Sequence, residues 1–197
     1  MFSRERPVNG NCFLFVRITL MGFDSSQYGA EVQAILALDG HGDRPMPLAS
    51  GKPVAAGVNS LSAWTAPRLF PDSFSPEAAM SGLYLYFCGY DESHKISQDI
   101  DTAEGSFWHG IMHRQEPDPG NSAYWFRRVG QHPIFPQLRA AAADLGLELK
   151  DNWDPFAFID FCESARNRTG SPDERTAMAI QLVEWQLLFD YCARPKP

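Results

Sequence analysis

The chain has 197 residues, with 17 Lys and Arg against 24 Asp and Glu, which gives a net charge of −7. This length favours one domain, and a composition of 21% charged and 44% apolar residues excludes wholesale disorder. The acidic balance argues against a protein that coats nucleic acid or an anionic membrane. The four cysteines, Cys12, Cys88, Cys162 and Cys192, form no CxxC pair, which excludes a disulfide scaffold and a zinc finger.

The first 20 residues lack the helix-capping pattern of the following sequence. They are predicted to be an N-terminal extension of a single helical domain over residues 21–197. The apolar stretch 12–23 is too short to span a bilayer and contains Arg17. No small-x-small cleavage site follows it cleanly, so we expect a cytoplasmic protein without a membrane segment.

From residue 24 onward, capping signals and the spacing of apolar residues predict successive helices. The first begins at Asp24 or Ser25 and runs to residue 38, where Gly40 supplies a left-handed exit. A long loop rich in Pro and Gly, with one short helix near Ser60, is expected over residues 39–73. Ser75, followed by a proline and an acid, then starts a helix to about residue 93.

Five more helices are predicted from similar start and stop signals, over residues 103–116, 121–129, 136–145, 155–167 and 172–192. The last is apolar almost all round from residue 182, which is typical of a central helix packed on several sides. No segment alternates with period two over a sustained length. We therefore predict an all-α fold, a single-domain, bundle-like helical array.

Four of the five histidines fall between His94 and His132. His109 and His113 are four residues apart on one predicted helix, so their side chains share a face, and Glu116 extends the same stripe. A reversing connection would bring His94 back towards His109. His94, His109 and His113 are the candidate ligands of a divalent metal ion, although the spacing also allows a metal-free polar site or structural histidines.

Glu116 and His94 are the candidate catalytic side chains, with Glu116 acting as a fourth ligand or general base. The substrate-binding candidates are the neighbouring aromatic and basic side chains, Trp108, Tyr124, Trp125, Arg127 and Arg128. The arginines suit a bound carboxylate or phosphate, or alternatively pair with a buried acid, for which Glu184 is the candidate. His132 precedes a proline and is expected to be a solvated loop residue.

The histidine-rich block reads YDESHKISQDIDTAEGSFWHGIMHRQEPDPGNSAYWFRRVGQHPIF. It resembles a family of small, uncharacterised bacterial helical proteins with the patterns DESHxISQ and WHxIxHRxExDxxNAxYWFRRxGxHP. The resemblance is close from Asp91 to Pro133, with Ser122 where a small residue is expected, and looser over the remainder from Met21. It implies that residues 21–197 are the functional unit, and it implies no particular activity.

These observations favour a metal-dependent hydrolase of a small ester, amide or lactone substrate, with a divalent metal ion as cofactor. An oxidative role at the same site is also open. The alternatives are a non-enzymatic helical module that binds a ligand or a protein partner, and a buried polar network that fixes the register of the helices. The sequence contains no GxSxG, GxxxxGK[ST] or GxGxxG motif.

Overall fold

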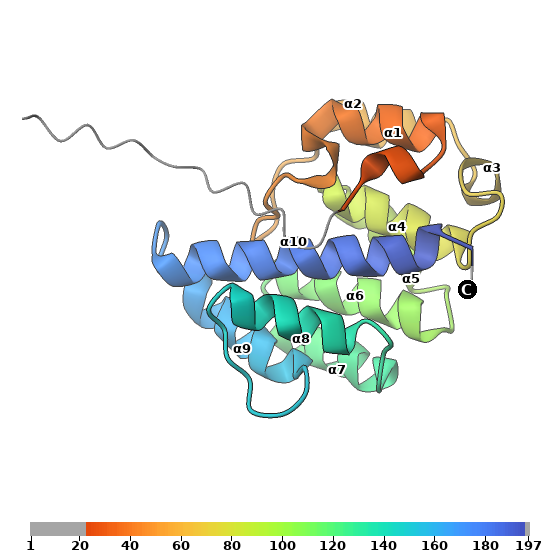
Figure 1. Ribbon diagram of the computed structural model, residues 1–197. Coiled ribbons are helices and arrows are strands. Elements are labelled where there is room, and N and C mark those ends of the chain that lie inside the picture. The colour runs from red at the N-terminus through yellow and green to blue at the C-terminus, as the bar shows by residue number, and fades with distance from the viewer. Residues whose placement is uncertain (1–22, 196–197) are drawn as a thin grey trace, which may run out of the picture.

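The computed structural model describes residues 23–195 (Figure 1), so the predicted extension over residues 1–20 lies outside the described residues. Within residues 23–195 the chain forms ten α-helices, two 3₁₀ helices and no strand, which confirms the all-α prediction. The α-helices are α1 (Ala30–Leu36), α2 (Ala55–Leu61), α3 (Ala66–Leu69), α4 (Pro76–Tyr86), α5 (Tyr90–Ser97), α6 (Ala103–Gln115), α7 (Pro119–Val129), α8 (Phe135–Asp144), α9 (Pro155–Arg166) and α10 (Pro172–Ala193).

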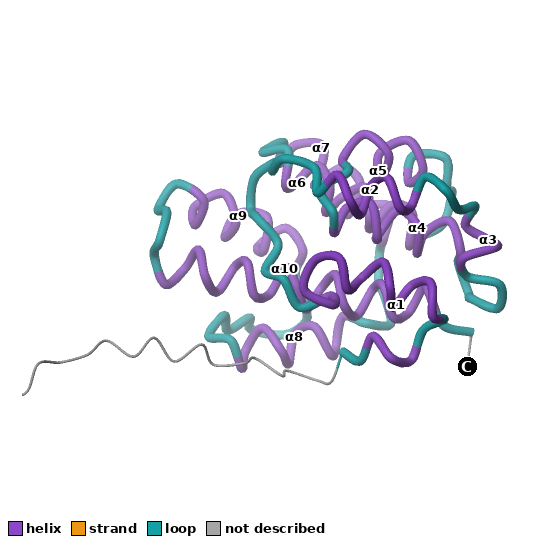
Figure 2. The backbone as a smooth tube through the Cα atoms, turned by 90° about the horizontal axis from the view of Figure 1, so that it is seen from above, coloured by secondary structure: helices purple, strands orange, loops and turns teal. Residues whose placement is uncertain are grey.

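The C-terminal helix α10 is the centre of the fold, as its apolar composition predicted. It crosses the molecule with α1–α4 on one side and α6–α9 on the other (Figure 1). Its buried side chains include Trp185 and Phe189, whose rings stack with centroids 4.9 Å apart. The Trp185 indole donates a 2.7 Å hydrogen bond to the carbonyl oxygen of Gly82 in α4. Seen from the perpendicular direction, the long loop over residues 43–54 crosses the face of the molecule between the α1 region and α2 (Figure 2).

The helix predicted from residue 76 to about residue 93 is in fact two helices, and this part of the prediction is wrong. Cys88 takes a left-handed conformation, with φ 57°. The amide of Gly89 donates to Tyr84 O at 2.8 Å and that of Cys88 to Leu85 O at 3.0 Å, the two bonds of a Schellman motif. The usual glycine signal is displaced by one residue, because Gly89 follows the left-handed position. The break sets the direction of α5, which carries His94.

The first predicted helix is also interrupted. The Asp24 carboxylate accepts from the Ser26 amide at 2.9 Å and caps a 3₁₀ turn, Ser25–Gln27, instead of an α-helix. Tyr28 is extended, and α1 begins only after Gly29. The left-handed exit at Gly40 is confirmed, with φ 76°. The short helix expected near Ser60 is α2, and the loop contains a second short helix, α3.

Three predicted caps are confirmed, and α4 begins at Pro76 as predicted, although the Ser75 side chain makes no capping hydrogen bond. The Thr102, Asp154 and Ser171 side chains accept from the first-turn amides of α6, α9 and α10. The predicted cap of α7, Asn121, is wrong, because Asp118 accepts from the Asn121 amide and α7 begins at Pro119. In the described part of the chain, no helix has both the length and the apolar composition needed to cross a membrane.

Candidate metal centre

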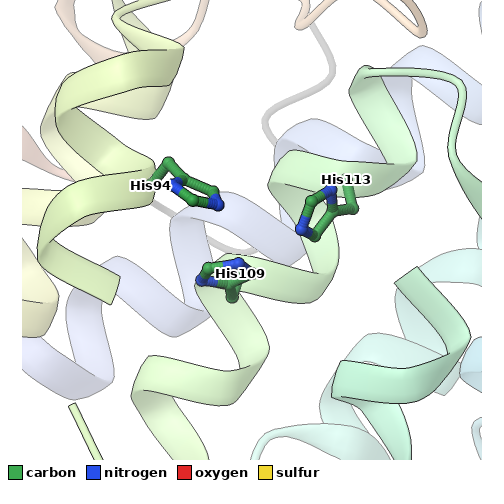
Figure 3. A group of neighbouring side chains, drawn as sticks. All are labelled: His94, His109 and His113. Atoms are coloured by element: carbon green, nitrogen blue, oxygen red, sulfur yellow. The ribbon is translucent and has the colours of Figure 1, made fainter. Parts of the chain in front are cut away.

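Three histidine side chains converge between α5 and α6. His94 lies on α5, whereas His109 and His113 lie one turn apart on α6. One potential ligand nitrogen of each lies within 4.8 Å of the others, and Figure 3 shows the three rings turned towards a common space. The centroid of the His94 ring lies 4.6 Å from that of the His109 ring and 5.7 Å from that of the His113 ring. The juxtaposition predicted from the spacing is therefore present, while metal binding itself stays a prediction.

The close approach of α5 and α6 depends on a glycine. A Cβ atom at Gly105, in the first turn of α6, would lie 2.4 Å from the carbonyl oxygen of Ile100. Ile100 belongs to the connection that reverses the chain after α5. Any other residue at position 105 would push this connection away, so the glycine allows His94 to reach the two histidines of α6.

Each histidine of α6 has a polar partner at its Nδ1 atom. Ser97 Oγ, at the end of α5, lies 2.9 Å from Nδ1 of His109, and the same hydroxyl donates to the carbonyl oxygen of His94 at 3.3 Å. Glu116 Oε2 lies 3.1 Å from Nδ1 of His113. Sequence reasoning missed Ser97, although its place three residues after His94 puts both on one face of α5 and was a usable signal.

Burial keeps two of these imidazoles uncharged at neutral pH. His109 is only 2% exposed, and burial, reinforced by His113 and His94, lowers its pKa to about 3. Burial also lowers the pKa of His113, although the nearby carboxylates of Glu116 and Asp118 oppose the change. A neutral imidazole has a free nitrogen lone pair, which is the form that binds a metal ion.

An aromatic and basic layer from α7 covers His109. The Trp125 ring lies with its centroid 4.0 Å from that of His109, and Tyr124 meets Trp125 edge-on at 5.4 Å. The Arg128 guanidinium lies 5.2 Å from the Trp125 ring centroid on this exposed face of α7. The structure thus brings three of the five predicted substrate-binding residues together beside the histidines.

The other two substrate-binding candidates lie elsewhere. Trp108 is fully buried in the core, where its ring packs against Gly82, because it points away from the histidine face of α6. Arg127 lies over the Phe156 ring at 5.9 Å and lines a groove of about 800 Å³ between α7 and the segment that precedes α9. The structure therefore corrects the assignment of both residues to the wall of the histidine site.

The predicted pairing of Glu184 with Arg127 or Arg128 is wrong. Glu184 on α10 is fully buried and forms an ion pair with Arg114 on α6, which is also fully buried. Arg127 and Arg128 lie on the exposed face of α7. The sequence did not reveal this pair because Arg114 and Glu184 are 70 residues apart, and their contact depends on how α6 packs against α10.

His132 is buried and not, as predicted, a solvated loop residue. It is 4% exposed and packs against the rings of Phe107, at 5.2 Å, and Tyr191, at 4.9 Å. Its Nε2 lies 3.7 Å from Oε1 of Glu104 at the start of α6. The His132 imidazole, with a contribution from the Thr102 hydroxyl, lowers the pKa of Glu104 from 4.5 to about 2. His132 thus belongs to a separate buried cluster.

Glu104→Gln is expected to lower the free energy of unfolding at pH 7 by about 1–2 kcal/mol. Because the folded-state pKa is depressed, the stabilisation from Glu104 is complete above its ordinary pKa of 4.5 and is lost as the pH falls towards 2. Urea unfolding of the wild type and the variant should therefore give a difference that shrinks between pH 4.5 and pH 2. A difference that stays constant across this range would contradict the role of the ionised carboxylate.

Comparison with known proteins gives no relationship from which a function can be transferred. No protein-family model, curated protein sequence or solved structure matches the chain. The functional argument therefore rests on the geometry of the site.

Proposed function

We propose that the protein is a metal-dependent hydrolase that acts on a small ester, amide or lactone substrate. The observation that carries this proposal is the convergence of His94, His109 and His113, whose candidate ligand nitrogens all lie within 4.8 Å of one another. Three imidazoles leave one or more coordination positions open, the arrangement typical of catalytic and not of structural zinc sites.

The donor set favours a borderline metal ion such as Zn²⁺. Imidazole nitrogens suit zinc, copper, nickel and iron, whereas magnesium and calcium prefer oxygen ligands. His94, His109 and His113 would hold such an ion, which would supply Lewis-acid activation of a carbonyl group and of water. Hydrolysis then adds water across the acyl bond and releases an acid with an alcohol or an amine.

The residues beside the histidines support a substrate with an apolar part and an anionic part. Trp125 and the half-exposed Tyr124 provide an aromatic surface next to His109. Arg128, over the Trp125 ring, offers a guanidinium group that suits a carboxylate. We assign these three residues to substrate binding.

Metal content tests the first part of the proposal. Protein purified without a histidine tag should contain close to one ion per chain. After removal of the ion with a chelator, Zn²⁺ at 100 times its dissociation constant should raise the melting temperature by about 5–10 °C, because binding stabilises only the folded state. Absence of bound metal, together with no thermal shift by Zn²⁺ or Mn²⁺, would contradict the proposal.

Two histidine variants test the link between the metal and the activity. His113→Ala should abolish metal binding and the hydrolysis of 4-nitrophenyl acetate while leaving the helical circular dichroism unchanged. The matched control is His41→Asn, which removes an exposed histidine from a left-handed position that asparagine tolerates. Equal turnover by His113→Ala and the control would remove the histidines from catalysis.

The same experiments separate the hydrolase from its rival, a non-enzymatic binding module. The exposed Tyr124 ring is the feature that favours the rival, because an exposed aromatic side chain is typical of an interaction surface. Protein without metal and without turnover, which still binds a partner in a manner lost in Tyr124→Ala, would favour the module.

A further inference from the structure

We infer that Ser97 and Glu116 are positioning residues that hold the proton of His109 and of His113 on Nδ1, so that Nε2 of each imidazole is the metal ligand. This inference rests on the proposed metal site and deepens it. It concerns two residues whose side-chain oxygens lie beside Nδ1 of each histidine of α6. A neutral imidazole carries its proton on one nitrogen only, and the hydrogen bond at that nitrogen selects which one.

The Ser97 hydroxyl has one hydrogen and two polar neighbours, and we assign its place from the chemistry of those neighbours. It is donated to the backbone carbonyl oxygen of His94 at 3.3 Å, an oxygen that can only accept. The lone pairs of Oγ are then left for Nδ1 of His109 at 2.9 Å, and we assign Nδ1 as the donor in this contact. Both side chains are buried, and water does not compete for either atom. Nε2 of His109 therefore keeps its lone pair.

Glu116 acts on His113 by a simpler route. Its Oε2 atom lies 3.1 Å from Nδ1 of His113, in an electrostatic contact and not an aligned hydrogen bond. An acceptor oxygen at this place favours the tautomer with a proton on Nδ1. The two residues are three apart at the C-terminal end of α6, which places them on one face. A carboxylate behind a metal-binding histidine also raises the basicity of the imidazole.

These contacts change the role expected for Glu116, and they orient the imidazole rings before a metal ion binds. With one oxygen on Nδ1 of His113, Glu116 is a positioning residue and neither a fourth ligand nor the general base. Ser97 connects the backbone of His94 on α5 to the ring of His109 on α6, so one hydroxyl ties together the two helices that supply the ligands. The inner ligands are then three imidazoles, which favours Zn²⁺ over Mg²⁺ and Ca²⁺.

Nitrogen-15 NMR of the metal-free protein tests the tautomers directly. Long-range proton–nitrogen correlation spectra at pH 7.5 should show a protonated Nδ1 and an unprotonated Nε2 in both His109 and His113. Ser97→Ala should leave His109 as a mixture of tautomers, and Glu116→Gln should do the same to His113. A protonated Nε2 in either wild-type histidine would overturn the inference for that residue, without recourse to any metal measurement.

Zinc titration provides the second readout. Ser97→Ala and Glu116→Gln should each raise the dissociation constant for Zn²⁺ about 10- to 100-fold, the effect typical of an outer partner of a metal ligand. The matched controls are Ser62→Ala, directly after α2, and Glu77→Gln, in the first turn of α4, which change exposed residues and should leave zinc affinity unaltered.

The two readouts distinguish the inference from the proposed function. Unchanged zinc affinity in both variants would overturn the positioning role while leaving the three-histidine site in place. Tautomers as expected in a wild-type protein that binds no zinc would instead overturn the proposed function. Glu116→Gln keeps the test decisive if Ser97→Ala does not fold, because the Glu116 side chain is 39% exposed and its shape is preserved by glutamine.

Discussion

Arg114→Met is expected to lower the free energy of unfolding by about 3–5 kcal/mol, the largest effect that we predict for a single substitution. Arg114 is fully buried and pairs with Glu184, and it donates to Gln181 Oε1 at 3.2 Å and 3.1 Å. Its guanidinium also lies 4.6 Å from the Phe158 ring centroid. Methionine would fill most of the volume but would leave a carboxylate buried among apolar side chains without a counter-ion.

Urea unfolding of Arg114→Met should be compared with that of Arg127→Met, which makes the same change at an exposed position and should cost less than about 0.5 kcal/mol. The double variant Arg114→Met with Glu184→Leu should recover most of the loss, because a buried ion pair replaced by apolar groups is often close to neutral. A loss below about 1 kcal/mol in Arg114→Met alone would show that the pair does not hold α6 against α10.

Gly105→Ala is expected to lower the free energy of unfolding by about 2–3 kcal/mol and to weaken zinc binding at least tenfold. In an unconstrained helix the same change would be stabilising by up to about 1 kcal/mol. Here the new methyl group would lie 2.4 Å from the Ile100 carbonyl oxygen, and a backbone atom in a tight connection cannot turn aside. The connection must shift, and His94 would move with α5 away from His109 and His113.

Gly120→Ala is the matched control for this variant. A Cβ atom there meets nothing closer than Asp118 Oδ1 at 3.6 Å, an ordinary contact in the first turn of α7. The two variants should therefore differ in the sign of their effect on the melting temperature, and only Gly105→Ala should alter the zinc titration. If Gly105→Ala is destabilised but binds zinc as tightly as the wild type, the prediction that Gly105 sets the position of His94 is contradicted.

Sequence alone predicted the start of a helix well at Thr102, Asp154 and Ser171, whereas the caps expected at Asp24 and Asn121 did not start the expected helices. Thr102 and Ser171 hold the first-turn amides of α6 and α10 because short polar side chains satisfy donors that the helix itself leaves free. The prediction failed at residues 87–89 because the left-handed residue is a cysteine, and nothing in its local chemistry indicates that conformation.

Part of the candidate site also follows from local geometry. His109 and His113 share a face because four residues make about one helical turn, and this holds in any fold that keeps α6 helical. The approach of His94 to these two histidines does not follow from local geometry. It depends on the break at Cys88 and on the missing side chain of Gly105, which together set where α5 lies.

The amino-acid sequence by itself determined the helical class, most helix boundaries and the pair of histidines on α6, since these depend on contacts within a few residues. Only the tertiary structure decided which residues meet across helices. It paired Glu184 with Arg114, buried His132 beside Glu104, and placed Trp108 in the core while Trp125 covers His109. The physical reason is that burial and pairing depend on how helices pack, and many packings are compatible with the same periodicity.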